Sequence, residues 1–255
     1  MKIALLQSAL EWENPQANCN HFADKIKSIA EPVDLIVLPE MFTSGFTMNP
    51  KLVAERMEGE TVMWMKNQAK ITQAAICGTA VINVAGLYYN RLLFVLPSGV
   101  IYFYDKRHLF SLAGEDKEYT AGTQKLIVDY KGFKFCLLTC YDLRFPVFSR
   151  NVENYDLLVY VANWPKPRIS AWDILLKARS IENMCYTIGV NRLGFDGNNH
   201  EYTGHSQVVD CLGNYLIAPS ENEGIFITTL EKNSMMETRN KLAFLDDRDA
   251  FRVLD

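Results

Sequence analysis

The chain has 255 residues, of which 49% are hydrophobic and 22% are charged, and its formal net charge is −4. This composition supports a large core without signs of disorder, and the lack of a basic stripe excludes nucleic acid as a main partner. The first residues, MKIALLQSAL, are typical of a first strand rather than of a signal peptide, and no apolar run reaches the length of a membrane span. The six cysteines include no CxxC pair. We therefore expect free thiols in a soluble, cytoplasmic protein with no membrane partner.

Strands and helices alternate in the first half of the chain. The expected elements are a strand at residues 2–7, a helix from 15 to about 30, a strand at 34–38, a helix at 60–70, a strand at 75–81 and hairpin strands at 91–96 and 100–104. Asn14 and Pro15 supply an N-cap and a first-turn proline for the first helix. The turn Pro97-Ser98-Gly99 predicts the hairpin, and a loop follows to about residue 122.

The second half follows a similar order. The expected elements are strands at 133–139, 156–161 and 186–191, hairpin strands at 206–210 and 215–218, a strand at 225–230 and helices at about 147–152 and 231–241. Another amphipathic helix is expected after 156–161, with Ser170 as its cap and with Trp172, Leu176 and Ile181 at helical spacing.

The two halves resemble each other. Asp34-Leu-Ile-Val-Leu matches Asp156-Leu-Leu-Val-Tyr, and each is followed by a helix, a strand and a hairpin. Each half would form a sheet with helices on one face, and packing the two bare faces together buries both. We therefore predict an α/β fold, a four-layer α-β-β-α sandwich with an internal pseudo-two-fold repeat. No linker divides the chain, so we expect a single domain over 1–255, with a tail at 239–255 that packs on its own subunit or across a dimer.

Cys140 lies where a buried strand stops and polar residues begin. At that position a cysteine is well placed to act as a nucleophile, and the following N–H groups can face a developing oxyanion. The alternative is a structural cysteine that behaves as a small hydrophobic residue.

Glu40 and Lys106 also follow predicted strands. Sites in sheets with helical crossovers form beyond the carboxyl ends of strands. Here a glutamate could accept the thiol proton and a lysine could stabilise the oxyanion. The alternatives are a loop or capping carboxylate and a solvated surface lysine.

Three segments resemble the signature blocks of the nitrilase (carbon–nitrogen hydrolase) superfamily. They are Leu38-Pro-Glu-Met-Phe42, Asp105-Lys-Arg-His-Leu-Phe110 and Leu138-Thr-Cys-Tyr-Asp-Leu-Arg-Phe-Pro146. The order Glu, Lys, Cys fits, and the resemblance covers nearly the whole chain. It implies the same α-β-β-α sandwich, a homodimer or larger oligomer, and chemistry that needs no metal or organic cofactor.

The resemblance also implies roles for single residues. Cys140 would be the nucleophile, Glu40 the general base and Lys106 the cation that stabilises the oxyanion, together with the backbone N–H of Tyr141. A second glutamate is expected shortly after the lysine. Glu115 fits that place, and Glu118 is the competing assignment.

The branch that the sequence resembles is that of the omega-amidases. The similar residues are Met41-Phe-Thr-Ser-Gly-Phe46, His108-Leu-Phe with Ala113-Gly-Glu115, and Ala162-Asn-Trp-Pro165. The resemblance implies a small-molecule substrate, the distal amide of a dicarboxylic acid monoamide such as 2-oxoglutaramate or 2-oxosuccinamate. The expected pocket walls are Phe42, Tyr141 and Trp164. Arg144 or Arg168 is expected to meet the substrate carboxylate, and a surface or ion-pair role is the alternative for both arginines.

Other functions remain as alternatives. A hydrolase of carbamoyl amides or of general aliphatic amides, and a non-catalytic nitrilase-like binding protein, would share the same fold. A papain-like hydrolase would instead need one of the four histidines oriented on the thiol. Cys19 and His21 form a lone pair without the second pair that a structural metal site requires. We therefore expect no metal.

Overall fold

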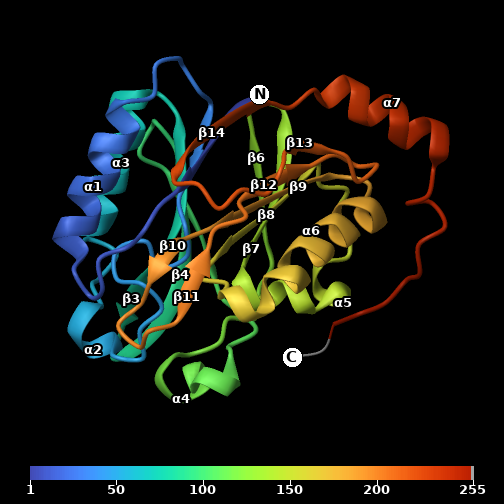
Figure 1. Cartoon of the computed structure of the whole chain (residues 1–255). Helices are drawn as coiled ribbons and strands as arrows, with labels where there is room; N and C mark the ends of the chain where they lie inside the picture. The colour runs from blue at the N-terminus through green and yellow to red at the C-terminus, as the bar shows by residue number, and fades with distance from the viewer. Residues whose placement is uncertain (254–255) are drawn as a thin grey trace.

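Two six-stranded sheets packed face to face form the middle of the computed structural model, which describes residues 1–253 (Figure 1). The first sheet contains, in spatial order, β14 (Gly224–Thr229), β1 (Lys2–Gln7), β2 (Leu35–Val37), β3 (Ala75–Val84), β4 (Leu87–Val95) and β5 (Ile101–Asp105). The second contains β13 (Tyr215–Ile217), β12 (Gln207–Val209), β9 (Tyr186–Asn191), β8 (Leu157–Ala162), β7 (Phe133–Thr139) and β6 (Leu126–Tyr130). A separate ribbon pairs β10 (Leu193–Phe195) with β11 (Glu201–Thr203).

Helices cover the outer face of each sheet (Figure 1). On the first sheet these are α1 (Pro15–Lys27) and α3 (Glu60–Thr72), and on the second α5 (Pro146–Ser149) and α6 (Ile169–Asn183). The remaining helical segments are α2 (Pro50–Val53), α4 (Glu115–Glu118), α7 (Lys232–Leu242) and the 3₁₀ turns η1 (Ser111–Ala113), η2 (Cys140–Arg144) and η3 (Lys166–Arg168). The layers therefore run α-β-β-α, and the predicted fold is confirmed. Within residues 1–253, no helix combines the length and the apolar character that crossing a membrane requires.

The internal repeat extends to individual hydrogen bonds. Asp34, just before β2, donates its N–H to the Lys2 carbonyl at 2.7 Å and accepts the Lys2 N–H on its side chain at 2.7 Å. Asp156, just before β8, makes the same two bonds with Lys134, at 2.7 and 2.9 Å. In both sheets the three central strands are parallel and their flanking strands are antiparallel. The matching Asp-Leu segments in the sequence thus begin equivalent central strands.

Alternation along the strands supplies two cores. In β1, Ile3 and Leu5 belong to the core between the sheets, whereas Ala4 and Leu6 belong to the core beneath α1 and α3. The rings of Phe94 and Phe135 meet between the two sheets, with centroids 5.3 Å apart. Because both faces of the central strands are buried, these strands are almost wholly apolar in sequence.

The structure corrects several predicted elements. Strand β6 and the ribbon β10–β11 were not expected. Only Val128 is fully buried in β6, and the ribbon strands are three residues long, so neither has a clear apolar pattern. The helix expected at 147–152 is the single turn α5, preceded by η2. Ser170 does not cap α6, because the turn η3 leads directly into the helix one residue earlier, at Ile169.

The predicted tail at 239–255 divides into two parts. Its first residues complete α7, and Leu245 is buried while Phe244 and Phe251 are exposed. After α7 the chain runs back along the side of the molecule that carries α5 and α6 (Figure 1). Residues 254–255 of this tail lie outside the described residues.

Candidate active site

Four ionisable side chains meet where strands of the two sheets end. Glu40 follows β2, Lys106 follows β5, and Cys140 follows β7. Glu115 is the first residue of α4, in the loop after β5. All four residues are buried, with exposed fractions of 0 to 9%. The structure thus brings together the four side chains for which the sequence suggested a catalytic role.

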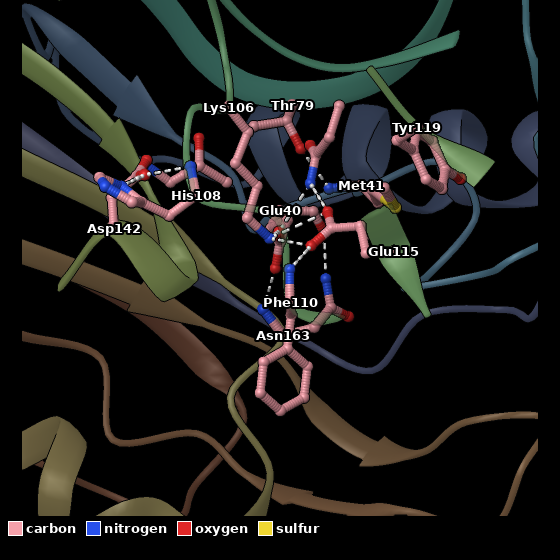
Figure 2. Close-up of polar contacts among 12 residues, drawn as sticks. Glu40, Met41, Thr79, Lys106, His108, Phe110, Glu115, Tyr119, Asp142 and Asn163 are labelled. Carbon is pink, nitrogen blue, oxygen red and sulfur yellow. Dashed lines mark hydrogen bonds and ion pairs between the residues drawn. The ribbon is translucent and has the colours of Figure 1, made fainter. Parts of the chain in front are cut away.

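Lys106 lies between the two glutamates (Figure 2). Its Nζ is 2.9 Å from Glu40 Oε1 and 3.0 and 2.9 Å from the two carboxylate oxygens of Glu115. Burial alone would lower the pKa of Lys106, but the Glu115 and Glu40 carboxylates raise that pKa well above its usual value. The ammonium group therefore stays charged, and it can offer a positive charge to an anion that forms in the site.

Two asparagines fix the position of Glu40. Asn90 Nδ2 donates to Glu40 Oε1 at 2.8 Å and to Glu115 Oε1 at 3.2 Å. Across the gap between the sheets, the backbone N–H of Asn163 donates to Glu40 Oε2 at 2.8 Å, and its side chain donates to the Glu40 carbonyl at 2.6 Å. Both oxygens of the Glu40 carboxylate are therefore held by donors from different sheets, which fixes the orientation of a candidate general base.

Glu115, and not Glu118, is the second glutamate beside Lys106. Glu115 Oε2 also accepts the backbone N–H of Phe110 at 2.6 Å, which closes the loop between these two residues. Burial raises the pKa of Glu115 and the charge of Lys106 opposes that rise. Glu118 is exposed at the end of α4.

Cys140 lies on a strained turn between β7 and η2. Its φ is +44°, in the left-handed region that residues other than glycine rarely adopt. Similar strand-to-helix turns present nucleophiles in hydrolases. Tyr141 follows in the first turn of η2, and the leading N–H groups of a helical turn have no partner within it. The Tyr141 N–H is therefore placed next to the thiol as a candidate oxyanion donor.

The thiol of Cys140 is held in its protonated form. Burial, the negative charge of Glu40 and a hydrogen bond to the Glu40 side chain raise the pKa of Cys140 well above its usual value, against the lowering effect of Lys106. A thiol of this kind reacts only when a base removes its proton as it attacks, and Glu40 is the carboxylate whose charge acts most strongly on it.

A cavity of about 480 Å³ opens onto Cys140. Its aromatic walls are Phe46, Phe110, Tyr141, Trp164 and Tyr202. The charged and titratable groups that line it are Arg144, Arg168, Asp196 and His200. Asp196 accepts hydrogen bonds from Tyr202 and from the ring and backbone of His200, at 2.9 to 3.1 Å. The cavity is therefore lined by Cys140, the candidate nucleophile, together with two arginines and several aromatic side chains.

Four of the five residues expected to contact substrate line this cavity, and Phe42 does not. Tyr141, Arg144, Trp164 and Arg168 are cavity residues. Phe42 is fully buried on the outer side of the first sheet, where its ring packs on Phe22 and Trp64. The chain turns after Glu40 at Met41, whose φ is +43°, and it is Phe46 that lines the cavity.

The histidines bond elsewhere than to Cys140 in the part of the chain that the structure describes. The partners are Ser8 for His21, Asp142 for His108, Asp196 for His200 and Asp173 for His205. This arrangement does not support a papain-like pair. Among residues 1–253, no three side chains of His, Cys, Asp or Glu are grouped so as to hold a metal ion.

Several residues that build the site were not expected from the sequence. Asn90 lies within β4, 50 residues from Glu40, and no local pattern marks it. Asp196, His200 and Tyr202 belong to the unexpected ribbon β10–β11 and its turn. Asn163 could have been suspected, because it follows β8 as Cys140 follows β7 in the parallel pair.

Comparisons with known proteins agree with this geometry. The family described as carbon–nitrogen hydrolase matches residues 2–240. Omega-amidase YafV of Escherichia coli K12 is 42% identical over 99% of this chain and 98% of its own length. A 2-oxoglutaramate amidase of Bacillus subtilis is 30% identical over 96% of both chains. The crystal structure of XC1258 from Xanthomonas campestris, a CN-hydrolase superfamily protein, superposes with a TM-score of 0.96 at 40% identity, over 99% of this chain and 98% of that one.

Proposed function

The chain belongs to the carbon–nitrogen hydrolase (nitrilase) family, and we propose that it is an omega-amidase that cleaves the distal amide of dicarboxylic acid monoamides. The relatives named omega-amidase and 2-oxoglutaramate amidase support this substrate class. The observation that carries it is a cavity lined by Cys140 and by two arginines, Arg144 and Arg168, which have no carboxylate partner within residues 1–253.

The first half of the reaction forms a thioester. Cys140 Sγ attacks the amide carbon while Glu40 takes the thiol proton. Lys106 Nζ and the Tyr141 N–H stabilise the negative charge that develops on the carbonyl oxygen. Glu40 then passes the proton to the amide nitrogen, the carbon–nitrogen bond breaks, and ammonia leaves. Glu115 holds Lys106 in place, since it makes two of the three carboxylate contacts to Nζ.

The second half releases the acid. Glu40, now without the proton, accepts one from a water molecule that attacks the thioester carbon. The same two donors stabilise the second oxyanion, which collapses with departure of the Cys140 sulfur. The sulfur recovers its proton from Glu40, and the products are a carboxylic acid and a restored thiol.

The two arginines that line the cavity suit a carboxylate. The Arg144 guanidinium lies 4.9 Å from the centre of the Trp164 ring, and that of Arg168 lies 5.2 Å from the centre of the Phe110 ring. Within residues 1–253 these two guanidinium groups have no hydrogen bond or ion pair to a carboxylate. The only carboxylate lining the described cavity, Asp196, is already bonded within its own turn. A bound anion would therefore find donors that do not compete with it.

Replacing Arg144 or Arg168 with glutamine should lower kcat/KM for substrates that carry a carboxylate and leave kcat/KM for uncharged amides nearly unchanged. Glutaramate and pentanamide form a matched pair, because a methyl group in one replaces the carboxylate of the other. We expect kcat/KM for glutaramate to fall about 10- to 100-fold in at least one variant, since a hydrogen bond to a charged group is lost. For pentanamide the change should stay within about 3-fold, because its chain makes no charged contact. Ammonia release measures both rates.

Lys166→Gln is the control for this pair of variants. Lys166 is a neighbouring exposed cation that binds Glu201 at 2.8 Å and does not line the cavity. Equal losses on glutaramate and pentanamide would contradict the assignment of the arginines. A wild-type preference for N-carbamoyl-β-alanine over glutaramate and 2-oxoglutaramate would favour the carbamoyl-amide alternative. Failure to release ammonia from any amide would favour the non-catalytic one.

The α5–α6 layer supports a homodimer. Val147 in α5 and Ile174 and Ile181 in α6 are exposed, and the last two are seven residues apart on one helix face. We expect a particle mass of twice 29.1 kDa by light scattering. Ile174→Lys should shift the mass toward one copy, because it places a charge in the apolar contact. If the wild-type protein is monomeric by light scattering at micromolar concentration, the proposed homodimer is contradicted.

A further inference from the structure

The Asp142 carboxylate joins the two loops that carry the candidate catalytic residues. It is fully buried and accepts four hydrogen bonds. Oδ1 accepts the backbone N–H of His108 at 3.1 Å and its ring Nδ1–H at 2.7 Å. Oδ2 accepts the N–H of Thr139 at 2.9 Å and the Tyr104 hydroxyl at 2.8 Å. Three of these donors belong to the chain around Lys106, and one belongs to the strand that ends at Cys140.

The His108 ring is fixed on the side of the Cys140 turn. It stacks on Phe145 with the ring centroids 3.7 Å apart and the planes 5° apart, and its edge meets Phe148. Both phenylalanines follow Cys140 in the chain. Figure 2 shows the His108–Asp142 pair next to the Lys106 side chain. His108 is two residues after Lys106, and Asp142 is two residues after Cys140, so the pair links the two loops close to both residues.

We propose that Asp142 and His108 are positioning residues that hold Lys106 and the Tyr141 N–H at the spacing that an oxyanion on Cys140 requires. The proposal rests on the amide hydrolysis proposed above. Oxyanion donors act only when they lie about 2.7 to 3.1 Å from the place that the oxyanion will occupy. Lys106 comes from the first sheet and Tyr141 from the second, so their spacing depends on contacts between the two loops. A displacement of about 1 Å can lower a rate about 100-fold.

The hydrogen bonds around residue 142 require a side chain that only accepts hydrogen bonds and donates none. Four donors converge on Asp142, and two of them, the N–H groups of Thr139 and His108, belong to the backbone and cannot rotate. Asparagine has the same shape, but its NH₂ group must replace one oxygen and so face one of these N–H groups. Asp142→Asn should therefore separate the loops slightly without leaving a cavity.

Asp142→Asn can be compared with Asp156→Asn in the full-length protein. Asp156 is also buried and accepts from a backbone N–H, that of Lys134, and from Lys232, but at the opposite end of β7. We expect Asp142→Asn to lower kcat on glutaramate about 100-fold with KM within about 3-fold, because the spacing matters only when the oxyanion forms. Asp156→Asn should keep the wild-type kcat even if it lowers the melting temperature by a similar amount.

His108 supplies a second test that does not depend on the folding of Asp142→Asn. The side-chain amide of asparagine can place a donor where His Nδ1 lies, so His108→Asn should retain kcat within about 10-fold, whereas His108→Leu should fall as far as Asp142→Asn. The double variant Asp142→Asn with His108→Leu should show little further loss, because both changes break the same link. If the losses in kcat of the two single variants multiplied in the double variant, Asp142 and His108 would act independently, and the proposal would be overturned. A wild-type kcat in Asp142→Asn or in His108→Leu would overturn it as well.

Alkylation of Cys140 by iodoacetamide separates this proposal from the substrate assignment. The modified peptide is quantified by mass spectrometry, with no need for a substrate. In Asp142→Asn the pH profile should shift toward that of a free thiol, rising through about pH 8.5, because the turn no longer holds the thiol against Glu40. Asp156→Asn should keep the wild-type profile. Identical profiles in all three proteins would overturn the positioning role, and inactivity of the wild type on every amide would overturn only the proposed function.

Discussion

Replacing Cys140 with alanine is expected to lower ammonia release from 2-oxoglutaramate and glutaramate by about 10⁴-fold or more. Without the sulfur no thioester can form, and the remaining groups can only bind the substrate and polarise its carbonyl. Cys140→Ser should be similarly inactive. The protein should stay folded, since the turn is held by the Asp142 carboxylate rather than by the Cys140 side chain. Ammonia release and thermal unfolding measure the two effects.

Cys136→Ala is the matched control for this experiment. Cys136 lies in the same strand, β7, four residues earlier, and its side chain is fully buried in the hydrophobic core. Its loss should lower stability modestly and leave kcat near the wild-type value. Residual turnover above about 1% of wild type in Cys140→Ala would contradict the nucleophile assignment, because a lost nucleophile costs several orders of magnitude.

The positions of Glu40, Lys106 and Cys140 could be predicted because each depends on a local pattern. Glu40 and Cys140 follow strands that are buried and almost wholly apolar, and the first ionisable residue after such a strand lies at the edge of the sheet. Lys106 instead comes directly after β5, an edge strand whose Tyr102 and Phe103 are exposed. The fold was predictable for a related reason. The two Asp-Leu segments make equivalent bonds in equivalent strands, so the repeat in the sequence is a repeat in the structure.

The contacts that orient these residues could not be predicted in the same way. Asn90 binds Glu40 from the middle of a strand 50 residues away, and Asn163 does so from the other sheet, 123 residues away. Such pairs depend on how strands and sheets pack against each other, and the hydrophobic periodicity of a single segment carries no information about that packing. Phe42 illustrates the same limit. Because Phe42 is two residues after Glu40, we expected it in the substrate pocket. The chain turns at Met41, which has a left-handed backbone conformation, and the Phe42 ring packs on Trp64 on the helix-covered face of the first sheet.

Replacing Lys106 with methionine is expected to impair both catalysis and folding. The oxyanion would lose its cation, and loss of one such donor lowers kcat by about 10²- to 10³-fold. Two fully buried carboxylates, Glu40 and Glu115, would also be left without the ammonium group that lies 2.9 Å from each. Removing one partner from a buried ion pair costs about 3 to 5 kcal/mol of the free energy of unfolding. Steady-state kinetics and urea unfolding at neutral pH measure these two losses.

The pH dependence of the stability loss has a definite sign. The carboxylates raise the pKa of Lys106 in the folded protein, so its contribution is complete below the unfolded lysine pKa of about 10.4 and disappears only as the pH rises through the higher folded value. The difference in unfolding free energy between wild type and Lys106→Met should thus be constant from neutral pH to about pH 10. On acidification it should shrink, because Glu115, whose pKa is already raised by burial, takes up a proton and removes the repulsion in the variant.

A second substitution separates the two roles proposed for Lys106, in catalysis and in stability. In the double variant Lys106→Met with Glu115→Gln, Glu40 is the one carboxylate left of the two that contact Lys106, so most of the lost stability should return. The activity should not return, because the oxyanion still has no cation. Lys125→Met is the control for a lysine outside the site. Lys125 pairs with Glu153 at 2.9 Å near the surface, and its loss should cost about 1 kcal/mol or less with kcat unchanged. Recovery of activity in the double variant would show that Lys106 only balances the charge of Glu115, and the oxyanion would then depend on the Tyr141 N–H alone.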